Sequence, residues 1–197
     1  MGIAERKGRE RAEREQRIVA AARAIAEREG WGAVTIRRLA EEIEYSQPVL
    51  YSHFANRDAI VAAVAVDGFK QITVALREAA GEAIGRQNAL RSVATAYLAF
   101  GLRRPALYEA MFVLPTNLRF AEAETRPELQ AAFEALAAVV SPFCADVAVA
   151  TETFWAALHG LTELERSGRI RPAARDERIA RVVGAVVGGG RKPAARG

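Results

Sequence analysis

The stretch TIRRLAEEIEYSQPVLYSHFANRDAI, from Thr35 to Ile60, decides the fold that this sequence predicts. Its first part has the apolar spacing of an amphipathic helix that begins after Thr35, whose hydroxyl can cap free backbone amides. The spacing is interrupted at the tripeptide EYS, and a second, short helix is predicted to follow. Ser46 precedes this helix as another predicted capping residue, and Pro48 lies in its first turn, where a missing amide hydrogen costs nothing.

The two sides of this second segment differ in character. Leu50 and Phe54 are four residues apart, so they pack together on the inner side of a helix. The outer side carries hydrogen-bonding and apolar side chains, with an aromatic residue at its edge: Gln47, Val49, Ser52 and His53, with Tyr51. Two short helices joined by a tight turn, with a packed inner face and a polar outer face, are typical of a helix-turn-helix. The second helix would then be a recognition helix that presents its outer side chains to base edges in the major groove.

The same stretch closely resembles the DNA-binding domain of the TetR family of bacterial transcriptional regulators, over roughly residues 15 to 65. The family pattern has a threonine that opens the second helix, a serine before the recognition helix, and Leu-Tyr-x-His-Phe followed by a basic and an acidic residue. The matching positions are Thr35, Leu39, Ala40, Ser46, Leu50, Tyr51, His53, Phe54, Arg57 and Asp58. The sequence departs from the pattern at Pro48 and Val49, and at Glu44, where the family usually has a glycine. A residue other than glycine is strained where the turn requires a positive φ.

The resemblance implies DNA contacts for a set of residues in and around the two short helices. They are Thr35, Arg37, Ser46, Gln47, Pro48, Val49, Tyr51, Ser52, His53 and Arg57. Thr35, Tyr51 and Arg57 match family positions that contact phosphates, and the outer side of the recognition helix is expected to read bases. Three residues keep an alternative interpretation: Tyr51 as an aromatic at the core edge, His53 as a packing residue and Arg37 as a solvated charge.

Charge and composition limit the classes of protein without selecting one. The net charge of +4 and the pI of about 9.6 permit an acidic partner, but residues 1–57 and residues 58–197 are each net +2. No run approaches the roughly 18 apolar residues that a membrane span needs, and the N-terminus is charged where a secretory signal would be apolar. We therefore expect a cytoplasmic protein, and the family resemblance implies a bacterial one. The single cysteine, Cys144, allows no intrachain disulfide and no cysteine-based zinc site, and we expect no metal or other cofactor.

The whole chain is predicted to be all-α, with a three-helix helix-turn-helix domain followed by a larger helical bundle for ligand binding and dimerisation. Apolar spacing predicts a first helix from about Arg9 to Glu29, whose polar start frays. We expect a flexible arm at residues 1–12, the DNA-binding domain at 13–58, the effector and dimerisation domain at 59–188, and a flexible tail at 189–197. The stretch from Leu114 to Arg126 is expected to be a loop that covers or gates a site.

The second half of the chain carries a weaker resemblance. Arg-Pro-Ala-Leu-Tyr-x-x-Met-Phe at Arg104–Phe112 and Trp-x-x-x-His-Gly at Trp155–Gly160 are similar to the effector domain of the TetR subgroup named for its Trp-His-Gly signature. This resemblance implies that the domain binds a small effector. Large apolar side chains with a few polar atoms suit a mostly apolar ligand, although the same spacing is common in an ordinary core. The predicted pocket residues are Tyr97, Phe100, Tyr108, Met111, Phe112, Trp155 and His159.

Dimerisation is implied through the last two long helices, about Ala148–Ser167 and Arg175–Val187. One recognition helix touches few bases, whereas two helices about 34 Å apart read a palindrome. The last helix offers an apolar stripe wider than a small domain leaves exposed. The predicted interface residues are Ile179, Val182, Val183 and Val186.

The resulting hypothesis is a repressor that a small-molecule effector releases from a palindromic operator, by changing the angle of the fourth helix. A helical-bundle enzyme is disfavoured because neither His53 nor His159 has a glutamate three residues before it, and no phosphate-binding glycine loop is present. A ligand-binding or protein-interaction adaptor that shares the fold without binding an operator remains the alternative.

Overall fold

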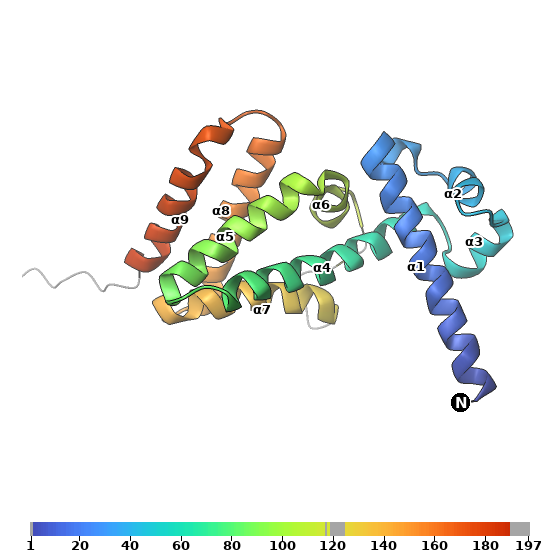
Figure 1. Cartoon of the computed structure of the whole chain (residues 1–197), viewed down its shortest axis with the longest axis horizontal. Helices are drawn as coiled ribbons and strands as arrows, with labels where there is room; N and C mark the ends of the chain where they lie inside the picture. The colour runs from blue at the N-terminus through green and yellow to red at the C-terminus, as the bar shows by residue number, and fades with distance from the viewer. Residues whose placement is uncertain (1, 117, 119–124, 190–197) are drawn as a thin grey trace, which may run out of the picture. The chain divides into compact units, whose positions relative to one another are not determined.

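The computed structural model of the chain describes residues 2–116, 118 and 125–189, and these residues form helices joined by short connections, without a β-strand among them (Figure 1). The all-α prediction is therefore confirmed. The chain divides into two compact units. The first contains residues up to Gly68 and a segment that starts at Arg104, and the second contains Phe69 to Arg103 together with the last helices. We describe each unit by itself.

The first unit is built on a long helix, α1 (Ile3–Glu29), which is followed by the short 3-10 helix η1 (Trp31–Ala33). Its other helices are α2 (Ile36–Glu42), α3 (Gln47–His53), the first half of α4 (Arg57–Gly81) and α6 (Pro105–Phe112). Apolar side chains from these helices form its core, and those with no exposed surface include Ile18, Ala22, Ile25, Leu39, Leu50, Ile60 and Leu107. The helix-turn-helix predicted from Thr35 onward is present as α2 and α3.

Helix α1 begins earlier than its apolar spacing predicts. The helix starts at Ile3, so the prediction that residues 1–12 form a flexible arm and that the start of the helix frays is wrong for the described residues. The Glu5 carboxylate accepts a hydrogen bond from the Gly2 amide at 2.8 Å, which caps the helix. Ion pairs four residues apart then replace apolar packing along this segment, as in Arg11 with Glu15 at 3.0 Å.

The end of α2 explains the unusual turn. The Tyr45 amide donates to the Ala40 carbonyl at 3.0 Å, across a residue with positive φ, which is the arrangement of a Schellman motif. That residue is Glu44, with φ of 55°, where glycine would be unstrained. At the start of α2, Thr35 Oγ1 accepts from the Arg38 amide at 3.1 Å, so the predicted cap is confirmed. Ser46 precedes α3 as predicted, but its side chain makes no capping hydrogen bond.

Helix α6 packs against α1 within the first unit, although the predicted boundaries assigned it to the effector domain. No side chain of its own N-cap residue satisfies its first amides. The Glu27 carboxylate of α1 accepts from the amides of Ala106 and Leu107, each at 3.2 Å, while Pro105 has no amide hydrogen. The Trp31 indole Nε1 donates to the Ala106 carbonyl at 2.8 Å. Glu27 and Trp31 therefore attach α6 to the end of α1.

A glycine allows α6 to approach α4 closely. A Cβ atom at Gly68 would lie 2.5 Å from Met111 Sδ and 3.0 Å from a methyl carbon of Leu107. Since real Cβ atoms do not approach other atoms this closely, only glycine fits at this position while Met111 keeps its conformation. The first unit therefore depends on α6 through three separate contacts, made by Glu27, Trp31 and Gly68.

The second unit is a bundle of α5 (Arg86–Arg103), α7 (Pro127–Val140), α8 (Val147–Arg166) and α9 (Arg175–Gly189), with the second half of α4. Helix α5 contacts α7, α8 and α9. The predicted bounds of the last two long helices agree with α8 and α9 to within two residues. Most of the predicted gating loop, at 117 and 119–124, and the predicted tail beyond Gly189 lie outside the described residues. Helix α4 is apolar enough in its most hydrophobic window to cross a membrane, but 56% of that window is buried.

The predicted dimer stripe on α9 is partly turned inward. Ile179 and Val183 are 1% and 0% exposed, so they pack in the core of the second unit and present no surface to a partner. Val182 and Val186 are half-buried. The expectation that all four side chains would lie in an interface is therefore wrong for Ile179 and Val183, because α5 and α8 of the same chain pack against α9.

A buried carboxylate joins α8 to the segment that enters α9. Only 2% of the Glu165 side chain is exposed, and it accepts hydrogen bonds from Arg175 and, at 3.1 Å, from Arg178. The Arg175 hydrogen bond is the main reason that the pKa of Glu165 lies below its ordinary value. The Arg178 Nε is buried without a hydrogen-bond partner, so this cation depends on Glu165 for compensation.

We predict that Glu44→Gly raises the free energy of unfolding by about 1 kcal/mol, because glycine relieves the left-handed backbone conformation. Urea unfolding followed by circular dichroism measures this change. Glu44→Ala is the control, since it removes the same carboxylate but keeps the Cβ atom, and it should give no gain. Equal stabilisation by both variants would assign the effect to the charge of Glu44.

We predict that Glu165→Gln lowers the free energy of unfolding by about 3 kcal/mol at pH 7, because it leaves Arg178 uncompensated. A folded-state pKa that is depressed stabilises the protein above the unfolded-state pKa, near 4.3, and this contribution is lost as the pH falls through the folded-state pKa. The stabilities of the unaltered chain and the variant should therefore differ fully above about pH 4.3 and converge only as the pH falls through the lowered folded-state pKa of Glu165. Glu177→Gln, which removes an exposed partner of Arg181, should change stability by less than about 1 kcal/mol. Parallel pH curves for the unaltered chain and Glu165→Gln would contradict the prediction.

Candidate nucleic-acid interface

The outer face of α3 carries exposed side chains with no structural task in the core. Gln47 and Pro48 are exposed in its first turn, and Val49 and Tyr51 are exposed by 36% and 53% of their surface. Leu50 lies between them in the sequence but is fully buried, so it holds α3 against the rest of the unit. An exposed valine beside an exposed tyrosine and glutamine gives this face both apolar contact and hydrogen bonding, which is the combination that reads a major groove.

Ser52 also lies on the exposed side of α3, but its hydroxyl is partly used within the helix. Ser52 Oγ donates to the Val49 carbonyl at 2.7 Å, so the oxygen remains as an acceptor. An acceptor at this position pairs with the amino groups that cytosine and adenine present in the major groove. Ser46, just before α3, is exposed and has no cap bond to occupy its hydroxyl.

His53 is turned toward α1 instead of outward. Its side chain is 5% exposed, and its Nδ1 lies 3.2 Å from Glu15 Oε1. The alternative of a packing residue therefore describes His53 in this structure, and the predicted DNA contact is not supported by its geometry. The pair instead fixes the last turn of α3 on α1, and Arg11 Nη2 adds a hydrogen bond of 3.3 Å to the Ser52 carbonyl.

Arg57 is likewise occupied by the protein itself. Its Nε donates to the Val34 carbonyl at 2.8 Å and its Nη2 to the Trp31 carbonyl at 2.7 Å. These bonds fasten the start of α4 to the connection between α1 and α2. Two nitrogen atoms of Arg57 are thus bonded to backbone carbonyls, which gives the residue a positioning role, while 39% of its side chain remains exposed and the predicted phosphate contact stays a prediction.

Thr35 and Arg37 keep the positions expected of phosphate-contacting residues. Both side chains are exposed at the start of α2, and Arg37 pairs with Glu41 on the next turn, its one carboxylate partner among the described residues, at 3.0 Å with 81% of the arginine side chain exposed. Such an exposed pair contributes little to stability, so a phosphate can replace Glu41 at low cost. Arg37 is therefore accessible to a DNA partner. It also forms a solvent-exposed ion pair with Glu41, as the alternative interpretation expected.

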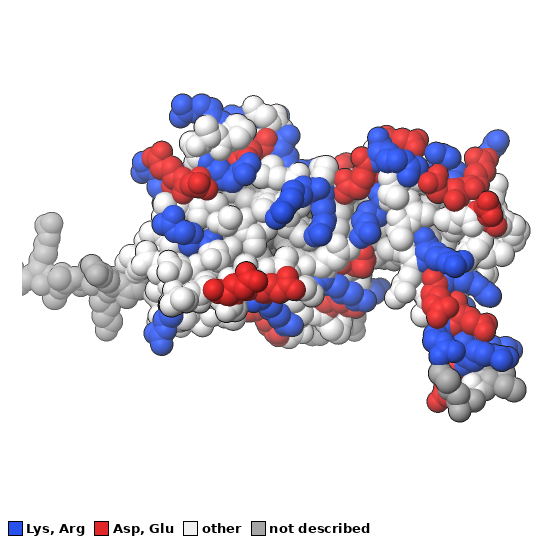
Figure 2. Space-filling model, in the orientation of Figure 1, with Lys and Arg blue, Asp and Glu red and all other residues white. Residues whose placement is uncertain are grey.

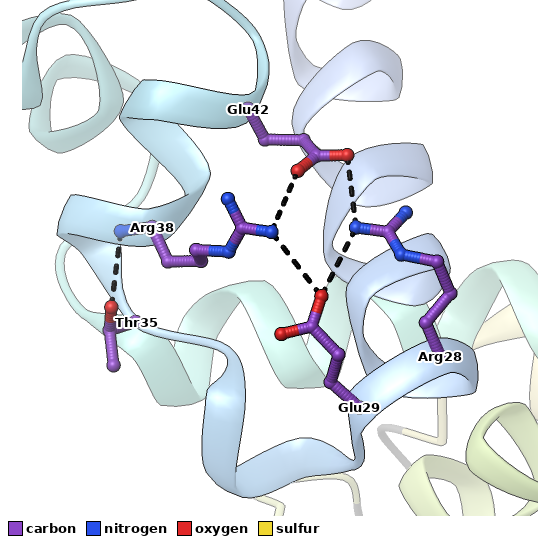
Figure 3. A network of polar contacts seen from close by, with 5 residues as sticks. All are labelled: Arg28, Glu29, Thr35, Arg38 and Glu42. Carbon is purple, nitrogen blue, oxygen red and sulfur yellow. Dashed lines mark hydrogen bonds and ion pairs between the residues drawn. The ribbon is translucent and has the colours of Figure 1, made fainter.

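A network of four charged side chains holds α2 against the end of α1 (Figure 3). Arg28 and Arg38 alternate with Glu29 and Glu42, with nitrogen–oxygen distances between 3.1 and 3.4 Å. The hydrogen bond from Arg38 is the main reason that the pKa of Glu29 lies below its ordinary value. The Arg38 guanidinium is thereby engaged in ion pairs that join α2 to α1, whereas the neighbouring Arg37 side chain is largely exposed.

The charge on this unit is mixed. Figure 2 shows Lys and Arg side chains interleaved with Asp and Glu side chains over the first unit, and not a broad surface of one sign. On the face that Figure 2 shows, a nucleic-acid partner would therefore be bound through specific contacts and helix placement more than through a field of one sign. This agrees with the equal net charge of the two parts of the sequence.

The predicted effector-pocket residues fall in both units. Tyr108, Met111 and Phe112 lie on α6 in the first unit, where the rings of Tyr108 and Phe112 are 4.7 Å apart. In the second unit the Trp155 indole Nε1 donates to the Tyr97 hydroxyl at 2.9 Å.

His159 and Phe100 complete the second-unit part of this set. His159 is half-buried, and burial keeps its pKa below its ordinary value despite the neighbouring Glu163 carboxylate, so the imidazole is neutral at pH 7. Phe100, like Tyr97, is almost fully buried.

Sequence patterns did not identify several residues that position the interface. They are Arg11, Glu15, Glu27, Trp31 and Gly68. One signal pointed to such partners: α6 begins Arg-Pro-Ala-Leu, which lacks a capping side chain, so its first amides needed an acceptor from elsewhere. Among the described residues no three His, Cys, Asp or Glu side chains gather to hold a metal ion.

Comparison with known proteins agrees with this geometry. Residues 18–64 match the model of the family described as bacterial regulatory proteins, tetR family, and residues 90–186 match a tetracyclin repressor-like C-terminal domain. The chain is 32% identical over 155 residues to the HTH-type transcriptional regulator Rv0681 of Mycobacterium tuberculosis, covering 77% of this chain and 69% of that protein.

Two solved structures share the fold. A protein of unknown function from Rhodococcus sp. RHA1 superposes with a TM-score of 0.74 at 24% identity, covering 89% of this chain and 94% of that one. PfmR, a TetR family transcriptional regulator from Thermus thermophilus, gives a TM-score of 0.59 at 18% identity, covering 86% of this chain and 96% of that one.

We predict that Gln47→Ala weakens binding to the preferred duplex by about 1–3 kcal/mol and relaxes the preference at one base position per half-site. Tyr51→Phe removes only a hydroxyl. It should weaken binding to every duplex by the same factor, whatever the base sequence, because a phosphate contact carries no base preference. Binding to a panel of single-base variants of the duplex distinguishes the two outcomes. Uniform weakening by Gln47→Ala would remove it from the base-reading set.

Proposed function

Since the chain belongs to the tetR family of bacterial regulatory proteins and is a DNA-binding transcriptional regulator, we propose that it is a repressor that a small-molecule effector releases from a palindromic operator. The observation that carries the DNA-binding part is the outer face of α3. Gln47, Val49 and Tyr51 are exposed there, while Leu50 and the His53–Glu15 pair hold the helix from its inner side. The regulators of this family are soluble proteins of the cytoplasm, where this chain would meet its operator.

The proposed operator contacts follow from which side chains are accessible. Gln47, Val49 and Ser52 would read base edges, with Pro48 and Ser46 beside them, while Thr35, Arg37 and Tyr51 would contact phosphates. His53 and Arg57 are left out of this set and are assigned to positioning α3 and α4. The helix then enters the groove as a preorganised unit, which reduces the entropy cost of binding.

The proposed assembly is a homodimer formed through α8 and α9. On α8 an exposed or half-buried stripe at spacings of three and four residues combines apolar ends with small central residues. Its members are Val149, Thr153, Ala156, Gly160 and Leu164. Gly184 and Gly188 lie exposed on α9. Small residues at the centre permit close helix approach, and Val149 and Leu164, 57% and 40% exposed, supply apolar area.

The proposed effector site lies in the C-terminal domain, which we assign to the subgroup with the Trp-x-x-x-His-Gly signature. Trp155, Tyr97 and the neutral His159 supply large apolar surface with hydrogen-bonding atoms, which suits a mostly apolar ligand with one or two polar groups. Helix α4 is continuous from Arg57 to Gly81 and belongs to both units, so a ligand that changes its angle would change the separation of the two recognition helices.

The first test is selection of bound sequences from a random duplex pool with the unaltered chain at near-physiological salt. A pseudo-palindrome with affinity well above that of non-specific duplex supports the proposal, and ligands that abolish binding to it identify the effector class. Enrichment of no sequence would favour an adaptor without operator binding.

The dimer is tested with a pair of matched substitutions. Ala156→Arg places a charge at the centre of the α8 stripe, so we predict monomeric mass by light scattering and loss of the palindrome preference. Ala24→Arg is the control, because it makes the same change at an exposed position of α1, and it should leave the mass dimeric. Monomeric mass of the unaltered chain would contradict the proposed assembly.

A further inference from the structure

The N-terminal end of α1 projects past α3 in Figure 1 although it lacks an apolar stripe. We call residues 4–16 the α1 extension; their side chains are exposed, except for the half-buried Glu15. A helix that is polar on all sides persists where ion pairs stabilise it or where it bridges to another surface. The distribution of its charges distinguishes these two roles.

One side of the α1 extension carries three cations: Lys7, Arg11 and Arg14. Their spacing of four and three residues continues to Ile18 and Ala22, which are fully buried in the core of the first unit. All five residues therefore lie along one face of α1. We call Lys7, Arg11 and Arg14 the cationic stripe; it occupies the face that is apolar further along the helix.

The other sides of the extension are neutralised. Their ion pairs join Arg6 with Glu10 at 3.8 Å and Arg9 with Glu13 at 4.0 Å. Within the cationic stripe, Arg11 pairs with Glu15, whereas Lys7 and Arg14 are exposed and have no carboxylate partner among the described residues. Figure 2 shows Lys and Arg side chains gathered with Asp and Glu on this projecting end. The uncompensated positive charge thus lies on one side.

That side faces the direction in which α3 presents its base-reading residues. Helix α1 packs against the inner side of α3, and Gln47 and Tyr51 lie on the opposite, outer side. The hydrogen bond from Arg11 to the Ser52 carbonyl places the cationic stripe at the C-terminal end of α3. The α1 extension continues beyond the C-terminal end of α3. There, α3 no longer covers the face of α1 that carries the cationic stripe, so this face is open toward a duplex that α3 enters.

We propose that the cationic stripe is a second DNA-contacting surface, at which Lys7 and Arg14 bind phosphates of a strand that borders the major groove occupied by α3. This inference rests on the proposed function, since it requires α3 to enter DNA. Lys7 lies about 6 Å beyond Arg11 along the helix axis, which is about half the width of the major groove. A lysine binds phosphate as a point charge, and an arginine binds it through a planar fork of N–H donors. Neither side chain needs a second residue of the α1 extension to orient it for a phosphate contact.

The test compares two double variants on the duplex that the unaltered chain selects from a random pool. Lys7→Gln with Arg14→Gln should reduce the magnitude of the slope of log affinity against log salt by about 3.6, for four lost phosphate contacts per dimer. Affinity at about 50 mM salt should fall by more than about 1,000-fold, and the loss should be roughly 150-fold smaller at about 200 mM salt, which is the change that a slope difference of about 3.6 gives over a fourfold range of salt. Glutamine favours helix as strongly as lysine and arginine, so circular dichroism should remain unchanged.

The matched control is Arg6→Gln with Arg9→Gln, which removes the same charge from ion-paired positions of the same helix that lie outside the cationic stripe. Its salt slope should stay within about one unit of the unaltered value. Equal slope changes in both double variants would assign the effect to net charge and overturn the proposal, as would an unchanged slope for the Lys7 and Arg14 variant. If the unaltered chain binds no duplex, the proposed function fails as well, whereas retained binding with an unchanged slope overturns only this inference.

Discussion

Trp31 is the residue on which the arrangement of the first unit depends. Its indole nitrogen donates to the Ala106 carbonyl of α6 at 2.8 Å, and its own carbonyl accepts from Arg57 of α4 at 2.7 Å. The side chain is 5% exposed, directly after the end of α1. Because an indole N–H left without a partner in such a place is costly, α1, α4 and α6 are held together by a contact that tolerates few alternatives.

This arrangement separates the residues that are proposed to contact DNA from those that set their position. The outer face of α3 is exposed at Gln47, Val49 and Tyr51, whereas its inner face and its last turn are held by Leu50 and by the His53–Glu15 pair. Arg57 and Glu27 then connect the same unit to α4 and α6. A change in α4 or α6 would therefore alter where α3 is held without changing the side chains that it presents, which is a physical basis for control at a distance.

The sequence predicted much of this structure because local signals were strong. The cap at Thr35 and the limits of α8 and α9 follow from residue types and apolar spacing within single segments, whereas the positive φ at Glu44 was expected from the family pattern, which has glycine at this position. Apolar spacing also finds which face of α9 is buried. It does not tell which element covers that face, and so Ile179 and Val183 were assigned to a partner when they belong to the core of the same chain.

Two residues that were predicted to contact DNA have partners within the chain that the sequence did not reveal, and for a related cause. His53 lies at the border between the two faces of α3, and its direction is decided by Glu15, 38 residues earlier. Arg57 finds its carbonyl partners 23 and 26 residues away. The start of α1 was expected to fray because it is polar on all sides, and the cap and ion pairs that the structure shows there leave no apolar period in the sequence. Partners distant in sequence and helices without an apolar face are thus the features that a local pattern does not reveal.

The first unit takes its residues from two separated parts of the chain. Helix α6 belongs to it, although α5, which precedes α6 in the sequence, belongs to the second unit. Fusing the N-terminal helices to a different C-terminal domain would therefore remove α6 and leave Glu27, Trp31 and Gly68 facing an unrelated surface. Recombination between regulators of this architecture is constrained accordingly: a functional exchange must carry α6, or an equivalent helix, along with the DNA-reading helices. The segment that must be exchanged as a whole is therefore larger than the stretch that is proposed to contact the operator.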